Sequence, residues 1–325
     1  MTPHLIAPKD LRCHVLQDGN HQVSILSLGC ITQNWLVSHR GQDVPVVLGY
    51  QDPLHYIGQS ESIGAIVGRV ANRISKASFT LNGQHHHLPA NIKPDHLHSG
   101  PTGLGHQNWD MEGDDKSVRL TYHSPDGEGG YPAAVNFEVV ITLSENQLTY
   151  DMKASVDRPT PINLAQHNYY NLMGGAGPIW DHDLQINAHG TTTLDNKLIP
   201  TGFIDSIANT NLDFRKIRNL GEADPSKTGS DANLVLTQNE KVNATLTAPN
   251  GLSLRLSTDQ PGLQLYTGSS LYEQNPPLNG QKHAPFHGIC LEAQQFPDAV
   301  NRPEFPSIIV TPDKSYRQVT TVEIS

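Results

Sequence analysis

The sequence predicts an all-β fold, an antiparallel sandwich or barrel, from two observations: apolar residues that alternate with polar ones, and tight turns between these runs. Alternation with a period of two is the pattern of a strand with one buried face. It recurs along the chain, in Val118, Leu120 and Tyr122, in Val139, Ile141 and Leu143, and in Leu252, Leu254 and Leu256.

The runs are separated by short sequences that favour tight β turns. These are Asn82-Gly83, Pro125-Asp126-Gly127 and Pro249-Asn250-Gly251. Glycine and asparagine tolerate the left-handed backbone that such turns need. Long runs with helical spacing are missing, so an antiparallel fold is favoured over alternating strands and helices.

Length and composition restrict the class of protein further. The 325 residues contain no linker rich in Pro, Gly and Ser and no repeat of fixed period, so residues 1–325 are expected to form a single domain. The formal charge of −10 repels nucleic acid and anionic membranes. Residues 1–18 lack the pattern of a secretion signal, and no apolar run approaches membrane-spanning length, so a cytoplasmic protein is expected.

Two features of the sequence could suggest a metal site or a disulfide bond, but their spacing argues against both. Cys13, Cys30 and Cys290 are far apart and odd in number, so they are interpreted as ordinary thiols. The run 85–87, three histidines after an Asn-Gly turn, would point to alternate faces of a strand and is expected to be a solvated hairpin flank.

Four stretches place polar groups where a purely structural role explains them poorly. They are residues 68–74 with two arginines and an asparagine, 95–100 with two histidines, 163–172 around His167, and 288–294, where Glu292 interrupts an apolar strand. A hydroxyl-rich ligand would partner such groups, but so would internal salt bridges and hydrogen bonds. Strand alternation predicts that His96 and His98 share one face, and that His167, Tyr169 and Asn171 share another. Glu292 must be paired, raised in pKa, or functional.

These stretches resemble the aldose 1-epimerase (galactose mutarotase) family, in the family's order and over nearly the whole chain. The segments that carry the resemblance are GRVANRI, FTLNGQHHHLPAN, LHSG, SPDGEGGYP, NLAQHNYYNL, LIPTGFID, LDFR, QLYTG and GICLEAQQFPDAVN. Ser99 replaces the first glycine of the family's LHGG element, and Asp231 lacks the histidine that follows it in many relatives.

The resemblance implies a large antiparallel β-supersandwich of the galactose mutarotase type, with an open sugar cleft and no cofactor or metal. His167 is similar to the family's general acid and Glu292 to its general base. The resemblance implies that six further residues bind the sugar: Asn72, Arg73, His98, Tyr169, Asp231 and Gln264. The implied substrate is a free aldohexose, galactose or glucose, and the implied assembly is a monomer or homodimer.

The chemistry of ring opening needs one group to start deprotonated and another protonated, so an ionised Glu292 and a cationic His167 are expected. Asp231 is expected to raise the pKa of His167. Three other interpretations stay open at this point. They are a sugar-binding protein without catalysis, an epimerase for hexose 6-phosphates, which would need more cations, and a glycoside hydrolase, which would use a carboxylate pair.

Overall fold

The computed structural model describes residues 10–325, and strands dominate it. Among these residues the only α-helix is the four-residue α1 (Leu220–Ala223). Each ladder between two strands is antiparallel, as the turn sequences predicted. The part of the predicted N-terminal segment before residue 10 lies outside the described residues.

Within residues 10–325 the strands form three main sheets and four two-stranded ribbons. The nine-stranded sheet has the order β10 (Asp110–Gly113), β11 (Ser117–Ser124), β12 (Val135–Ser144), β13 (Gln147–Val156), β27 (Tyr316–Ile324), β23 (Ser253–Thr258), β22 (Ala244–Thr247), β17 (Asp183–Ile186) and β20 (Arg218–Asn219). The six-stranded sheet has the order β16 (Tyr169–Tyr170), β25 (Ile289–Gln294), β24 (Gly262–Tyr266), β21 (Asp231–Leu236), β18 (Ala188–Leu194) and β19 (Pro200–Ser206).

The remaining strands are shorter or lie in smaller groups. The four-stranded sheet contains β1 (Cys13–Asp18), β2 (His21–Leu26), β3 (Thr32–His39) and β4 (Gln42–Pro45). The ribbons pair β14 (Thr160–Pro161) with β26 (Ile309–Val310), β15 (Ala165–Gln166) with β5 (Ile66–Val67), β6 (Arg73–Ile74) with β9 (His96–Leu97), and β7 (Ser78–Leu81) with β8 (Gln84–His87).

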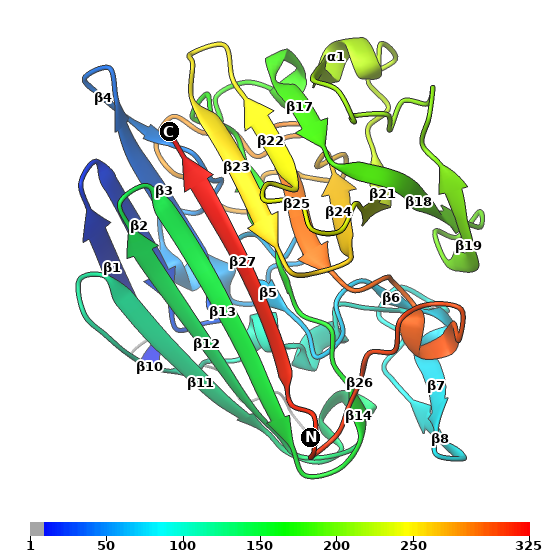
Figure 1. Cartoon of the computed structure of the whole chain (residues 1–325). Coiled ribbons are helices and arrows are strands. Elements are labelled where there is room, and N and C mark those ends of the chain that lie inside the picture. The colour runs from blue at the N-terminus through cyan, green and yellow to red at the C-terminus, as the bar shows by residue number, and fades with distance from the viewer. Residues whose placement is uncertain (1–9) are drawn as a thin grey trace.

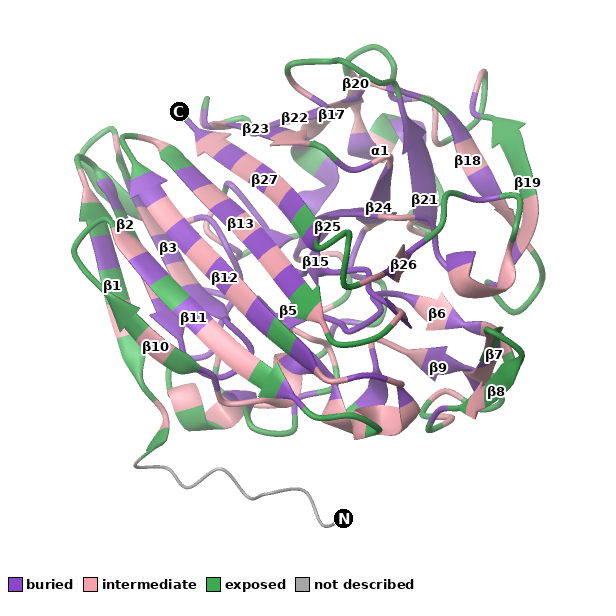
Figure 2. Cartoon of the chain, turned by 60° about the horizontal axis from the view of Figure 1, so that its bottom comes forward, coloured by how far each residue is buried: buried purple, intermediate pink, exposed green. Residues whose placement is uncertain are grey.

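The nine-stranded sheet covers one side of the core, and β13, β27 and β23 run side by side in it (Figure 1). Its strands alternate between buried and partly exposed residues, which Figure 2 shows as bands along β12, β13 and β27. One apolar cluster joins its buried face to both other sheets, through Trp35 of the four-stranded sheet and Leu291 of the six-stranded sheet. Because only one face is buried, both smaller sheets pack on that same face.

The predicted alternation and turns are confirmed. Val139, Ile141 and Leu143 are fully buried, and Asn82-Gly83 joins β7 to β8 with positive φ at both residues. The histidine run 85–87 lies on β8, where His85 and His87 are exposed. Among residues 10–325, no helix has the length and apolar character needed to span a membrane.

Candidate active site

A polar cavity of about 350 Å³ lies over the outer face of the six-stranded sheet, and all eight residues singled out in the sequence line it. Three of them come from neighbouring strands: Asp231 from β21, Gln264 from β24 and Glu292 from β25. Gln264 lies directly opposite Glu292 in the ladder, so the two side chains point to the same face. Every residue of β25 is buried, because the other face packs on the core.

Two irregular segments bring Asn72 and His98 to the same cavity. Both residues have a left-handed backbone, with φ of 64° and 50°. The N–H of Asn72 donates to Nδ1 of His98 at 3.1 Å, and the N–H of His98 donates to the carbonyl of Asn72 at 3.1 Å. These two bonds hold the segments together next to the β6–β9 ribbon, in which Arg73 pairs with Leu97.

The prediction that strand alternation gave was wrong for two residues near the site. His96 is buried away from the cavity, where Nε2 lies 3.0 Å from the hydroxyl of Tyr131, because the positive φ of His98 ends β9 and turns the chain. Asn171 follows β16 and donates to the carbonyls of Gly177 and His287, so it stabilises loops.

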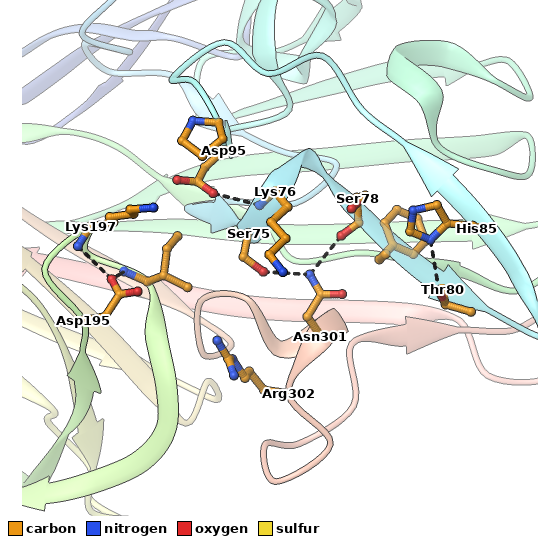
Figure 3. A pocket seen from close by; sticks show the side chains of 13 residues that line it. Ser75, Lys76, Ser78, Thr80, His85, Asp95, Asp195, Lys197, Asn301 and Arg302 are labelled. Atoms are coloured by element: carbon orange, nitrogen blue, oxygen red, sulfur yellow. Dashed lines mark hydrogen bonds between the residues drawn. The ribbon is translucent and has the colours of Figure 1, made fainter.

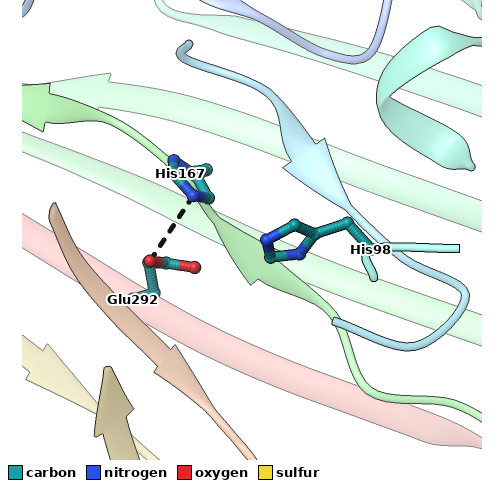
Figure 4. A group of neighbouring side chains, drawn as sticks. All are labelled: His98, His167 and Glu292. Atoms are coloured by element: carbon teal, nitrogen blue, oxygen red, sulfur yellow. Dashed lines mark ion pairs between the residues drawn. The ribbon is translucent and has the colours of Figure 1, made fainter. Parts of the chain in front are cut away.

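The two residues interpreted as acid and base face each other directly (Figure 4). Nε2 of His167 lies 3.5 Å from Oε1 of Glu292, and the side chains are only 6% and 2% exposed. The backbone of His167 is fixed by hydrogen bonds to Ala65 and Gly64. The other carboxylate oxygen of Glu292, Oε2, is buried and has no hydrogen-bond partner among residues 10–325. A buried acceptor of this kind is costly unless a ligand supplies a donor.

Burial shifts both members of the pair toward their neutral forms. Burial lowers the pKa of His167 to about 4. Burial, and then the charge of Asp231, raises the pKa of Glu292 well above its ordinary value, against the opposing effect of Arg73. The expectation that Asp231 raises the pKa of His167 is therefore wrong.

Asp231 has different partners from the one expected. It accepts a hydrogen bond from the amide of Gln264 and lies 3.6 Å from the guanidinium of Arg73. Its charge therefore acts on Glu292 and on the orientation of Arg73.

Tyr169 completes the floor of the cavity. Its ring packs beside His167 with 5.2 Å between the ring centroids, and its hydroxyl donates to the carbonyl of Glu61. The sulfur of Cys290 lies 3.7 Å from Nδ1 of His167.

Three side chains offer possible metal-ligand atoms that lie within 4.8 Å of one another, a spacing that a metal ion could bridge. They are His98, His167 and Glu292. Nδ1 of His98 already accepts the N–H of Asn72, and burial lowers the pKa of His98 well below its ordinary value. The neutral ring therefore carries its proton on Nε2, the nitrogen that a metal would need. This donor set does not fit a metal ion, and His98 instead presents an N–H donor to the cavity.

The sequence reasoning missed part of the lining: Ser60, Glu61, Ser62, Leu97, Leu198, Tyr266, Ser269 and Ser270. No local pattern marks these residues, except that Tyr266 lies two positions after Gln264 in β24 and shares its face. Arg69, by contrast, is outside the cavity. Its guanidinium donates to Ser124, Pro125, Pro132 and Ala133, so this arginine stabilises a turn.

The fold and the cavity define a class of protein: a β-supersandwich with a small polar cavity over a buried imidazole–carboxylate pair. The family model for aldose 1-epimerase matches residues 12–323. The chain belongs to the aldose 1-epimerase family.

Individual relatives agree with this assignment. The chain is 37% identical to the galactose mutarotase of Rattus norvegicus, over 95% of this chain and 93% of that protein. It is 31% identical to the aldose 1-epimerase of Escherichia coli K12, over 84% and 83% of the two chains.

Solved structures show the same architecture. The GalM/aldose epimerase homologue from C. elegans superposes with a TM-score of 0.91 at 25% identity, over 97% of this chain and 99% of that one. Galactose 1-epimerase from Lactobacillus acidophilus gives 0.84 at 26% identity, over 97% and 94%. The predicted galactose mutarotase-like supersandwich is confirmed.

Proposed function

We propose that this protein interconverts the α and β anomers of free aldohexoses such as galactose and glucose. The observation that carries the proposal is the buried pair of His167 and Glu292, 3.5 Å apart, in a cavity lined by hydroxyl, amide and imidazole groups. Anomer interconversion requires two proton transfers at one hemiacetal, and an imidazole and a carboxylate at this separation supply both.

Glu292 acts as the base and His167 as the acid in ring opening. Glu292 removes the proton of the anomeric hydroxyl, and the electrons of that O–H bond form the carbonyl at C1. The bond between C1 and the ring oxygen breaks, and the ring oxygen takes a proton from Nε2 of His167. After rotation about C1–C2, the reverse transfers close the ring on the other face of the carbonyl. The anomeric hydroxyl binds to Oε2 of Glu292, an acceptor that has no partner in the described part of the chain.

The pKa shifts support these roles. Burial favours the form of the pair in which Glu292 carries the proton and His167 is neutral, and moving that proton to His167 gives the ion pair. A raised pKa makes the carboxylate of Glu292 a stronger base, and a lowered pKa makes the imidazolium of His167 a stronger acid. The form that reacts has the proton on His167. Arg73 favours it, because its positive charge stabilises the carboxylate of Glu292.

The remaining predicted residues bind and orient the sugar. Asn72, Arg73, Asp231 and Gln264 offer amide, guanidinium and carboxylate groups to sugar hydroxyls, His98 offers an N–H, and Tyr169 supports the ring of His167. These contacts govern affinity more than turnover, because they are made in the ground state as well as in the transition state.

Polarimetry of freshly dissolved α-galactose and α-glucose tests the proposal. The expected result is an approach to anomeric equilibrium that is faster in proportion to the concentration of enzyme. A protein that binds galactose without accelerating the change would be a non-catalytic sugar-binding protein, and the proposal would be wrong.

The lining of the cavity does not favour a phosphorylated sugar. Within residues 10–325, Arg73 is the only lysine or arginine that lines the cavity, and it is already close to Asp231. A phosphate dianion usually requires several cations. Galactose 6-phosphate added to the assay is therefore expected to compete weakly with galactose.

We also propose that residues 1–325 work as one domain in the cytoplasm, as a monomer or homodimer. One apolar cluster runs from Leu16 to Ile324, which supports a single cooperative unit. Cys13, Cys30 and Cys290 are unpaired, as is usual in a reducing compartment. Sedimentation at several concentrations tests the assembly, and a single thermal transition tests the single domain.

A further inference from the structure

The end of the most specific motif, the sequence FPDAVN at residues 296–301, does not line the sugar cavity. It lies behind the segment that carries Arg73. Asp298 is 1% exposed and has a left-handed backbone with φ of 57°. A buried carboxylate in this backbone conformation is unusual for a connecting turn, and its contacts show what it holds.

Asp298 binds the chain on both sides of Ile74. Its own N–H donates to the carbonyl of Arg73 at 3.0 Å, and its Oδ1 accepts the N–H of Ser75 at 3.0 Å. The same Oδ1 accepts the amide of Asn301 at 2.9 Å. The second oxygen, Oδ2, lies 3.3 Å from Nε of Arg302.

The side-chain amide of Asn301 also holds this segment, through hydrogen bonds to Ser75 and Ser78. Its amide nitrogen reaches the hydroxyl of Ser75 at 3.3 Å and the carbonyl of Ser78 at 3.0 Å, as Figure 3 shows. From the other side, Oδ1 of Asp95 accepts the N–H of Lys76 at 2.8 Å (Figure 3). Two aspartates therefore hold consecutive backbone N–H groups, those of Ser75 and Lys76.

The held segment is strained. Lys76 and Ala77 both have positive φ, 54° and 45°, in a region that residues with a side chain occupy at a cost. Such a conformation persists only when surrounding contacts enforce it. Directly before this turn are Asn72 and Arg73, whose side chains enter the sugar cavity.

We propose that Asp298 is a positioning residue for the sugar site, which acts by fixing the backbone of Arg73 and Ser75. With that backbone fixed, the guanidinium of Arg73 stays 3.6 Å from Asp231 and faces the cavity. The consequence for substrate affinity rests on the function proposed above. The consequence for the backbone of residues 72–77 does not depend on it.

Hydrogen exchange of residues 72–77 tests the backbone part. Asp298→Ala removes the acceptor for Ser75, and the exchange of this segment is expected to accelerate while distant strands such as β12 stay protected. Asp298→Asn keeps an acceptor oxygen and is expected to retain most of the protection. Arg302→Met is the matched control, because it removes only the charge facing Oδ2, and it is expected to exchange like the original protein.

Unchanged exchange of residues 72–77 in Asp298→Ala would overturn the proposal, whether or not the protein is an epimerase. If that variant does not fold, Asp298→Gly replaces it, since glycine removes the same acceptor and adopts the positive φ of 57° without strain. Unchanged exchange in a folded Asp298→Gly variant counts against the proposal in the same way.

Steady-state kinetics test the affinity part. Asp298→Ala is expected to raise KM for galactose roughly five- to tenfold, the usual effect of one lost hydrogen bond to a buried group, with kcat changed much less. Asp298→Asn should restore most of the affinity. In an Arg73→Ala background the same Asp298→Ala change should have little further effect on KM. Equal effects in both backgrounds would show that Asp298 does not act through Arg73.

The two proposals fail in distinguishable ways. If the original protein has no mutarotation activity, the proposed function is refuted. Hydrogen exchange of residues 72–77 still decides the role of Asp298 in that case.

Discussion

Nε2 of His167 lies 3.5 Å from Oε1 of Glu292, and both side chains are almost completely buried. His167 lies between the short strands β15 and β16, whereas Glu292 is in the middle of β25. The pairing of Tyr169 with Cys290 joins these elements and brings the two residues together. Proton transfer to and from one hemiacetal needs this proximity.

Replacing either member of the pair with its closest amide analogue should nearly abolish catalysis. His167→Asn and Glu292→Gln are expected to lower kcat at least about 10²-fold, because each removes one proton-transfer group while keeping a similar shape. Polarimetry measures kcat, and isothermal titration with galactose checks that the sugar still binds. Near-normal turnover in either variant would overturn the assignment.

The kcat/KM of the enzyme should stay at its full value down to about pH 5, because burial lowers the pKa of His167 to about 4. As the pH falls toward the pKa of His167 of about 4, the pair gains a second proton and Glu292 can no longer act as base. At high pH the pair loses its remaining proton as it passes the raised pKa of Glu292. A midpoint near 6.5 on the acid side, matching an unperturbed histidine, would contradict this assignment.

The stability of the protein should decrease between pH 6.5 and 4 partly through His167. The pKa of this residue is lower in the folded state, so the unfolded chain binds the proton first and stability falls as the pH falls. The full effect is about 3 kcal/mol, from a shift of the pKa from 6.5 to about 4. Thermal unfolding of His167→Asn across this range should show a correspondingly weaker pH dependence than the original protein.

Asp231→Asn should move the alkaline side of the rate profile to lower pH. The negative charge of Asp231 helps to raise the pKa of Glu292, so its removal brings that pKa down. KM for galactose should also increase, since the contact of Asp231 with Arg73 is weakened. An unchanged alkaline limb would show that Asp231 does not influence Glu292.

Ser99 occupies a position where the family has glycine, and its side chain has a structural role. The hydroxyl of Ser99 accepts a hydrogen bond from the N–H of Val70 at 3.0 Å. The residue has a positive φ of 61°. Ser99→Ala should destabilise the protein by roughly 1–2 kcal/mol, because the hydrogen bond is lost and the backbone stays strained. Ser99→Gly should be milder, because glycine adopts this backbone freely. Denaturant unfolding of the two variants measures the difference.

Much of the fold could be predicted from local sequence. Leu252, Leu254 and Leu256 are all buried, as alternation predicts, and Asn82-Gly83 forms the turn between β7 and β8. Where strands were short, the prediction failed. β9 contains only His96 and Leu97, and His98 turns out of it with a positive φ, so the two histidines do not share a face.

Local sequence was enough to predict the all-β class and, through a resemblance to a family, the eight residues that line the cavity, because strand period, turn chemistry and motifs are local properties. The lowered pKa of His167, the partners of Asp231 and the contacts of Asp298 became visible only in the folded chain. Each of these depends on burial and on distances between segments far apart in the chain. Those quantities arise when the sheets pack together, and no local pattern of residues encodes them.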